Sequence, residues 1–269
     1  MAASYERGVR GLKPRICILQ TDGTNCDLET AYACEIAGGI PELVHVNELR
    51  ERKHRLLDFQ LLIIPGGFTY GDDVHSGKIL AVELTSFFKD QIREFVQRGR
   101  PVLGICNGFQ VLVRTGLLPD LDLGNITATL MGNDSGRFEC RWVRLKVENS
   151  RCVFTSDIAG QTVYYQAAHA EGKFYAVQEV IDKLERNRQV VFRYTDDSGQ
   201  PTLSYPYNPN GSFNAIAGIC DPSGKVLGLM PHPERFVKPT QYPHWRREEI
   251  STPHGLYIFK NAIRYAANV

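Results

Sequence analysis

The chain has 269 residues, of which 43% are hydrophobic and 23% charged, values typical of a globular protein with a sizeable core. Lysine and arginine total 31 against 30 aspartate and glutamate, so no basic excess indicates a nucleic-acid or anionic-membrane partner. No uncharged apolar run approaches the roughly 20 residues of a membrane helix, and the N-terminus lacks the apolar stretch of a secretory signal.

The cysteines are seven in number, irregularly spaced and without a Cys-x-x-Cys pair. This pattern fits a reducing compartment better than a disulfide framework or a zinc site. The sequence therefore predicts a cytoplasmic protein without a metal site, in which most thiols are core residues.

Strand and helix patterns alternate through the first half of the chain, after a polar tail over residues 1–14. Apolar runs predict strands at residues 15–20, 43–46, 61–64 and 101–105. Helical spacing and helix-ending glycines predict helices at residues 28–37, 81–98 and 107–115. Such alternation is typical of a doubly wound, mostly parallel sheet flanked by helices.

The second half has a different pattern. Residues 141–148 alternate charged and apolar side chains, which predicts a half-exposed antiparallel strand. Further strands are expected at residues 189–194 and 226–230, and a helix at residues 255–267. Because no linker or repeat interrupts the chain, we expect residues 15–269 to form a single α/β domain with a mixed sheet and an antiparallel extension.

A candidate nucleophile, Cys106, lies where a predicted strand meets a predicted helix, in the sequence Gly-Ile-Cys-Asn-Gly at residues 104–108. This is the arrangement of a nucleophile elbow with cysteine in place of serine. A helix N-terminus favours the thiolate, and the neighbouring Asn107 amide is a natural oxyanion donor. The alternative is a buried cysteine in an ordinary glycine-bounded turn.

A second oxyanion donor is expected from Gly67 or Phe68, in the Pro-Gly-Gly-Phe segment that ends the strand at residues 61–64. Glycines there let backbone amides approach a ligand closely. Taken alone, the segment is equally compatible with a tight turn.

The general base must be chosen from seven histidines, two of which occur as His-x-Glu, at His169 and His232. His232 follows an apolar strand between two prolines, and a strand end of this fold class is where a base can reach a nucleophile at another strand end. Glu234 can then orient the imidazole. His169 is expected in a loop near the mouth of the site. A Cys–His–Glu set with two backbone donors is suited to acyl transfer from an amide.

The motifs at residues 104–110 (Gly-Ile-Cys-Asn-Gly-Phe-Gln) and 231–235 (Pro-His-Pro-Glu-Arg) resemble those of the class I, or triad, glutamine amidotransferases, whose fold is flavodoxin-like. Segments 23–27, 66–72, 133–142 and 208–212 are similar to the glutaminases of phosphoribosylformylglycinamidine synthase, an enzyme of purine synthesis. The similarity runs from about residue 15 to the final predicted helix.

The resemblance implies Cys106 as nucleophile, His232 as base and Glu234 as its partner. It also implies a glutamine pocket bordered by Gln110 and by the segment from Asn133 to Phe138, including Ser135 and Arg137. This chain has Ala170 where the family usually has glycine in His-Gly-Glu-Gly, which puts a backbone-specific role of that loop in doubt. Residues 237–252 match nothing that the resemblance explains.

The partners follow from what the chain lacks. It has neither a Gly-x-x-x-x-Gly-Lys-Ser/Thr loop nor a Gly-x-Gly-x-x-Gly fingerprint, so we expect no cofactor here, and ATP and magnesium on another subunit. The resemblance implies an ATP-dependent synthase subunit that receives ammonia and converts formylglycinamide ribonucleotide to the amidine, with a small bridging subunit. The alternative function is a stand-alone cysteine hydrolase of γ-glutamyl or peptide bonds.

Three arginines have two possible roles. Arg137, Arg141 and Arg144 are equally compatible with a docking face or pocket and with a solvated strand.

Overall fold

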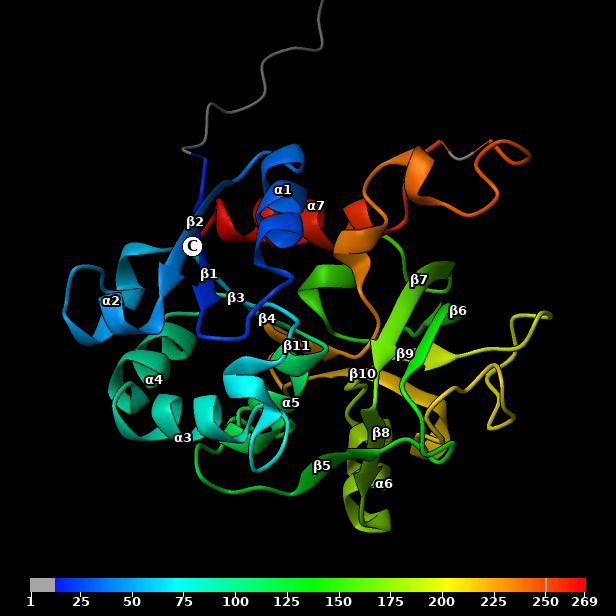
Figure 1. Ribbon diagram of the computed structural model, residues 1–269, viewed down its shortest axis with the longest axis horizontal. Helices are drawn as coiled ribbons and strands as arrows, with labels where there is room; N and C mark the ends of the chain where they lie inside the picture. The colour runs from blue at the N-terminus through cyan, green and yellow to red at the C-terminus, as the bar shows by residue number, and fades with distance from the viewer. Residues whose placement is uncertain (1–12, 250) are drawn as a thin grey trace, which may run out of the picture.

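The structure is a computed structural model that describes residues 13–249 and 251–269, so the predicted tail lies, except for its last two residues, outside the described part. Within that part, nine strands form one sheet in the order β2-β1-β3-β4-β11-β10-β9-β6-β7 (Figure 1). Their bounds are β1 Arg15–Gln20, β2 Ile40–His45, β3 Leu61–Ile64, β4 Val102–Ile105, β6 Glu139–Val147, β7 Thr162–His169, β9 Val190–Tyr194, β10 Ile216–Cys220 and β11 Val226–Leu229. Strands β5 (Ala128–Gly132) and β8 (Glu171–Ala176) form a separate antiparallel pair.

The sheet is mixed, as predicted. Strands β2, β1, β3, β4 and β11 run parallel to their neighbours, whereas β10, β9, β6 and β7 continue the sheet with antiparallel pairing. The antiparallel extension is therefore as large as the parallel part, with four of the eight neighbouring pairs. Every residue of β3, β4 and β11 is buried, which explains their uninterrupted apolar sequences.

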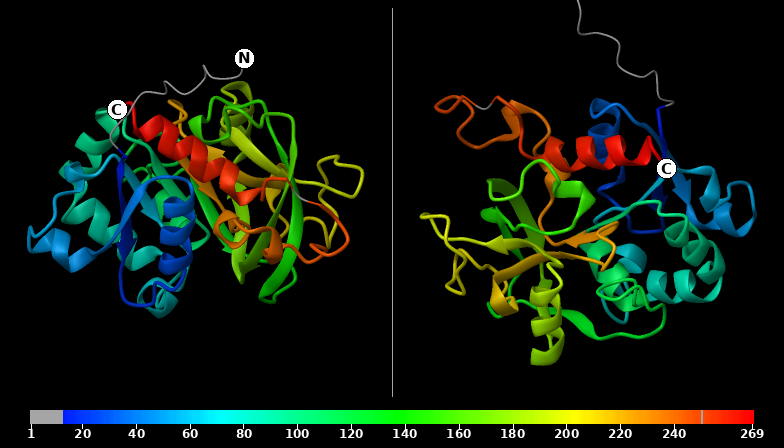
Figure 2. Two further views of the ribbon diagram at one scale, coloured as in Figure 1. Left: turned by 90° about the horizontal axis from the view of Figure 1, so that it is seen from above. Right: turned by 180° about the vertical axis from the view of Figure 1, so that it is seen from behind.

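Helices cover both faces of the parallel part (Figures 1 and 2). Helices α1 and α7 lie on one face, and α3 and α5 lie on the other. The helix bounds are α1 Asp27–Ile36, α2 Val46–Arg50, α3 Lys78–Ser86, α4 Lys89–Gln97, α5 Asn107–Thr115, α6 Gln178–Arg186 and α7 Gly255–Ala266. The carboxyl ends of β3, β4 and β11 meet at one edge of the sheet, so the segments that follow Ile64, Ile105 and Leu229 are brought together there.

The prediction of a single helix over residues 81–98 is wrong. The chain forms α3 and α4, separated at Phe87 and Phe88, although apolar residues continue at helical spacing through Leu84, Phe88 and Ile92. Helix α3 packs against α5, whereas α4 packs against the 3₁₀ turn at Leu56–Asp58. The break lets each half follow its own neighbour, and spacing alone does not reveal it.

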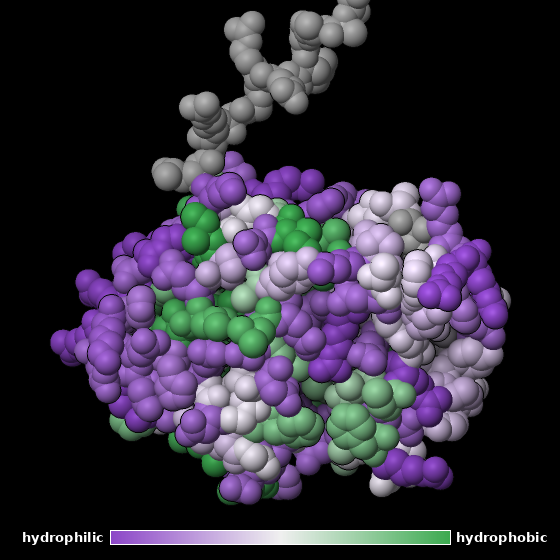
Figure 3. All heavy atoms as spheres, turned by 45° about the horizontal axis from the view of Figure 1, so that its top comes forward, coloured by the Kyte–Doolittle hydropathy of each residue, from purple (hydrophilic) through white to green (hydrophobic). Residues whose placement is uncertain are grey.

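Within residues 237–252, which the motifs left unexplained, Tyr242 packs against aromatic side chains of β6 and β7. The Tyr242 ring lies 6.3 Å from Trp142, 5.6 Å from Tyr164 and 5.5 Å from Phe236, measured between ring centroids. Elsewhere, apolar side chains form separate patches among hydrophilic ones on the face in Figure 3. No helix among the described residues is both long and apolar enough to span a membrane.

Candidate active site

Cys106 lies at the turn between β4 and α5, with φ 52° and ψ −105°, a left-handed backbone that a residue with a side chain rarely adopts. Its amide donates to the Leu229 carbonyl at 2.8 Å, and its carbonyl accepts from the Gln110 amide at 3.1 Å. These bonds hold the turn between β11 and the first turn of α5. The structure therefore places Cys106 at the predicted elbow, with 6% of its surface exposed.

The glycine at position 108 is required by the packing of this turn. A Cβ atom there would overlap the carbonyl oxygen of Ile64, at the end of the neighbouring strand β3. The elbow can therefore lie directly against the segment that follows β3.

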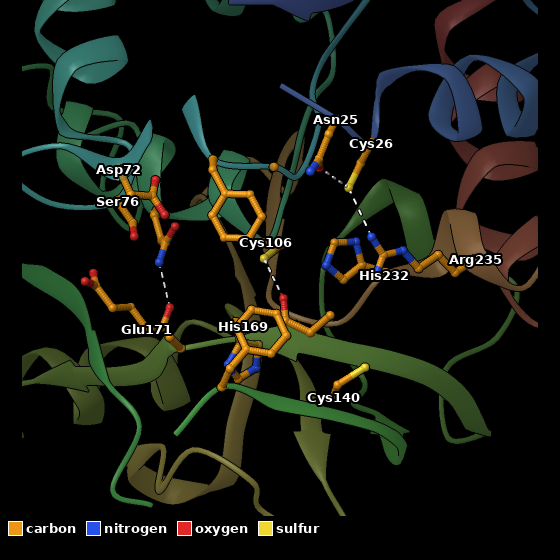
Figure 4. Close-up of a pocket in the computed structure, with 16 residues that line it drawn as sticks. Asn25, Cys26, Asp72, Ser76, Cys106, Cys140, His169, Glu171, His232 and Arg235 are labelled. Atoms are coloured by element: carbon orange, nitrogen blue, oxygen red, sulfur yellow. Dashed lines mark hydrogen bonds between the residues drawn. The ribbon is translucent and has the colours of Figure 1, made fainter. Parts of the chain in front are cut away.

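His232 and Glu234 follow β11 and are both buried. His232 Nδ1 lies 2.5 Å from Glu234 Oε1, and the His232 amide donates to the Gln166 carbonyl at 2.7 Å. The other ring nitrogen, Nε2, has no partner among the described residues, and Figure 4 shows the ring edge directed toward Cys106.

The electrostatics of this imidazole favour its charged form. Burial acts against the charge, but the Glu234 carboxylate and the Cys106 sulfur together raise the pKa of His232 well above its ordinary value. Gly66 permits this placement, since a Cβ at position 66 would lie 2.7 Å from His232 Cε1.

Two of the three predicted oxyanion donors are available. Among the described residues, the amides of Gly67 and Asn107 donate to no protein acceptor, and Asn107 is the first residue of α5, where the helix leaves its amides unpaired. The Phe68 amide instead donates to the Gly23 carbonyl at 2.9 Å. In this conformation Phe68 therefore supplies no donor.

Cys106 opens into a cavity of about 290 Å³, shown in Figure 4. The predicted residues Gln110 and Phe138 line it together with Gly67, Phe68 and His232. The residues of the wall that the sequence did not assign to it are Asn25, Cys26, Asp72, Ser76, Cys140, Ala168, Ala170, Glu171 and Arg235. His169, expected in a loop near the mouth, also lines the cavity, but as the buried last residue of β7.

The other three predicted pocket residues do not line this cavity. Asn133 is buried behind it, where its Nδ2 donates to the carbonyls of Arg137 and His169 at 2.9 and 2.8 Å. It therefore joins two loops of the wall. Ser135 and Arg137 line a separate cavity of about 340 Å³ beside Tyr205.

The family model of CobB/CobQ-like glutamine amidotransferase domains matches residues 13–266. A phosphoribosylformylglycinamidine synthase subunit PurQ from Dehalococcoides mccartyi is 48% identical, over 96% of this chain and 99% of the relative. The chain belongs to the PurQ family of glutamine amidotransferases.

Further relatives agree with this membership. A PurQ subunit from Methanococcus maripaludis is 41% identical, over 94% of this chain and 97% of its own. Among solved structures, a chain of PurLQS from Thermotoga maritima superposes with a TM-score of 0.73 at 33% identity, covering 94% of this chain and 99% of that one.

In this PurQ family member, Arg235 connects the N-terminal end of α1 with β7 beside the His232 imidazole. Its guanidinium donates to Glu29 Oε1 at 3.0 Å, Gln166 Oε1 at 3.2 Å and Cys26 Sγ at 3.3 Å. The side chains of Cys26, Glu29, His232 and Glu234 lie close enough to hold a metal ion, but the guanidinium already places a positive charge against two of them. Cys26 and Arg235 belong to quoted motifs, although nothing in the sequence indicated that these motifs pack together.

The sequence left open whether three arginines belong to a docking face or pocket, or to a solvated strand. None of the three, Arg137, Arg141 and Arg144, lines the Cys106 cavity. Arg141 pairs with Glu139 at 2.5 Å and donates to the Tyr205 hydroxyl at 2.8 Å, and Arg144 lies 3.8 Å from Asp197. For Arg141 and Arg144, these partners on the chain support a solvated, charge-paired strand, whereas Arg137 precedes β6 and lines the cavity beside Tyr205.

His169 is a buried, neutral wall residue. Its Nδ1 lies 3.1 Å from Asn133 Oδ1, and burial, reinforced by the charge of His232, lowers the pKa of His169 to about 3. The neighbouring Ala170 has an ordinary negative φ, so the glycine of related proteins is not required here.

We expect the pKa of His169 to make the protein sensitive to acid. Between pH about 6.5 and about 3 the unfolded chain binds this proton and the folded chain does not, so stability falls as pH falls, by roughly 1 kcal/mol per pH unit. Urea denaturation of His169→Gln at several pH values should show a shallower slope. The exposed His244→Gln control should retain the wild-type slope, and equal slopes in all three proteins would contradict the assignment.

Proposed function

We propose that this chain is the glutaminase subunit of a phosphoribosylformylglycinamidine synthase, with Cys106 as nucleophile, His232 as general acid and base, and Glu234 as the group that orients His232. The observation that carries the proposal is the buried His232–Glu234 pair, whose free Nε2 is directed toward the elbow cysteine where both residues line a cavity of amino-acid size (Figure 4).

The reaction starts from a Cys106 thiolate stabilised by the neighbouring imidazolium. The sulfur attacks the side-chain amide carbon of L-glutamine, and the resulting oxyanion accepts hydrogen bonds from the Gly67 and Asn107 amides. Its collapse breaks the carbon–nitrogen bond while His232 Nε2 donates a proton to the departing ammonia. A glutamyl thioester remains on Cys106.

Hydrolysis of the thioester completes the cycle. His232, now neutral, accepts a proton from a water molecule that attacks the thioester carbon, and glutamate leaves as the Cys106 thiolate is restored. Glu234 stabilises each charged form of the imidazole from Nδ1, and its burial confines this interaction to one geometry.

The ammonia needs an acceptor on another chain. The name of the Thermotoga maritima complex, PurLQS, supports assembly with an ATP-dependent synthase subunit and a small bridging subunit. We propose that residues 15–269 act as a single domain in this assembly, in the cytoplasm, where purine precursors are made.

Covalent labelling tests the proposal against a stand-alone hydrolase. The chain is treated with an electrophilic glutamine analogue, with and without excess glutamine and with and without the synthase subunit, and its cysteines are mapped by mass spectrometry. We expect one adduct, on Cys106, which glutamine suppresses. Labelling spread over several cysteines regardless of glutamine would refute the nucleophile. Turnover of γ-glutamyl peptides, unaffected by the synthase, would support the hydrolase.

A further inference from the structure

Two carboxylates, Asp72 and Glu171, line the Cys106 cavity without a cationic partner among the described residues. Figure 4 shows them with Ser76 on one side of Cys106, opposite the side that holds His232, Cys26 and Arg235. The catalytic mechanism described above uses neither carboxylate. The cavity therefore has an acidic end that the chain itself does not neutralise.

Both acids are connected to the residue that follows the nucleophile. Asn107 Nδ2 donates to Asp72 Oδ1 at 3.1 Å and to Gln110 Oε1 at 3.2 Å, and Gln110 Nε2 donates to the Glu171 carbonyl at 2.6 Å. The loop that carries Asp72 is itself constrained, with Asp72 at φ 54°. The Asp72 carboxylate and the backbone of Glu171 are thus both fixed relative to the first turn of α5, which follows Cys106.

The Glu171 carboxylate acts on Asp72 within the cavity that both residues line. Burial raises the pKa of Asp72, and the Glu171 carboxylate raises it further, although hydrogen bonds from Ser76 and Asn107 act in the other direction. A cation that bound between the two carboxylates would offset both the burial of Asp72 and its repulsion by Glu171. At the opposite end, Arg235 is already bonded to Glu29, Gln166 and Cys26, and the buried Nε2 of His232 is free toward the cavity.

We propose that Asp72 and Glu171 bind the α-ammonium group of the substrate and thereby restrict the site to amides of α-amino acids. The inference rests on the proposed glutaminase function. With the side-chain amide at Cys106, the amino-acid end of glutamine lies at the acidic side of the cavity. There its ammonium group forms charge-assisted hydrogen bonds with the two carboxylates.

The test compares two chloroketones that alkylate a nucleophilic cysteine and differ only in the ammonium group: 2-amino-5-chloro-4-oxopentanoate and 5-chloro-4-oxopentanoate. The rate of Cys106 alkylation is measured by mass spectrometry, with the synthase subunit present. In the wild type the amino compound should react faster by about 100-fold or more, as a charged hydrogen-bonding pair implies. Asp72→Asn and Glu171→Gln should each reduce that ratio by about 10-fold or more, through the amino compound alone.

The controls separate this inference from the proposed function. Asp73→Asn removes an exposed acid beside Asp72 and should leave both rates unchanged. Asn at position 72 can still accept the hydrogen bond from Asn107, so the elbow is preserved. An equal loss of rate with both reagents, or an unchanged ratio, would overturn the inference. Failure of glutamine to protect wild-type Cys106 from either reagent would instead overturn the glutaminase function itself.

Discussion

Cys106→Ala should reduce glutamine-dependent synthesis by at least about 10⁴-fold, because the substitution removes the only atom that forms the thioester. The alanine variant should still fold, since the lost sulfur leaves a small space at a site that already opens into a cavity. In the assembled complex, synthesis from added ammonia should continue at the wild-type rate. Glutamate release and amidine formation, measured in parallel with each nitrogen donor, check both expectations.

The matched control is Cys34→Ala, which removes a buried thiol on α1 that does not line the cavity. It should retain both activities. If Cys106→Ala also loses ammonia-dependent synthesis although the complex forms, the proposed division of labour between the two subunits is wrong.

Gly108→Ala should destabilise the protein by roughly 3 kcal/mol or more, because the added methyl group overlaps a backbone carbonyl that cannot rotate away. The Ile64 oxygen belongs to β3 in the middle of the sheet, so relief requires α5 to move away from it. That movement also displaces Cys106 relative to His232, and we expect glutaminase activity to fall by about 100-fold or more in any folded fraction.

Gly132→Ala is the comparison for this variant, since a Cβ at position 132 meets no atom within 4 Å. Urea denaturation should place Gly132→Ala within about 1 kcal/mol of the wild type. Similar stabilities for both alanine variants would show that the elbow tolerates a wider separation from β3 than the structure indicates.

The proximity of the three proposed triad residues could be predicted because each of them lies in a short local pattern. Gly-Ile-Cys-Asn-Gly predicts an elbow by backbone geometry alone, and the parallel-strand rule places the end of β11 beside the end of β4. His232 and Glu234 are two residues apart, so their mutual contact is also a local property. The buried strands β3, β4 and β11 could be predicted as well, because each is an uninterrupted apolar run in the sequence.

The rest of the site depends on contacts between segments far apart in the sequence. Asp72 and Glu171 meet at one cavity across 99 positions, and no spacing rule connects them. For Ser135 and Arg137, the sequence identified the right segment but not the right side chains. Their segment reaches the wall of the Cys106 cavity through Phe138, whereas Ser135 and Arg137 themselves line the neighbouring cavity. The sequence also predicts the Phe68 amide as an oxyanion donor. It cannot show that the Gly23 carbonyl lies 2.9 Å from this amide and accepts its hydrogen bond.

The backbone of Cys106 has a consequence for how this protein can change over time. A residue with a side chain in the left-handed region costs on the order of 1–3 kcal/mol, a cost that glycine avoids. The proposed role of Cys106 as nucleophile opposes that replacement. Activity and stability are thus in direct conflict at this one position. A lineage that obtained its nitrogen from free ammonia would no longer be held to cysteine here, and replacement by glycine would release this backbone strain as the catalytic function disappeared.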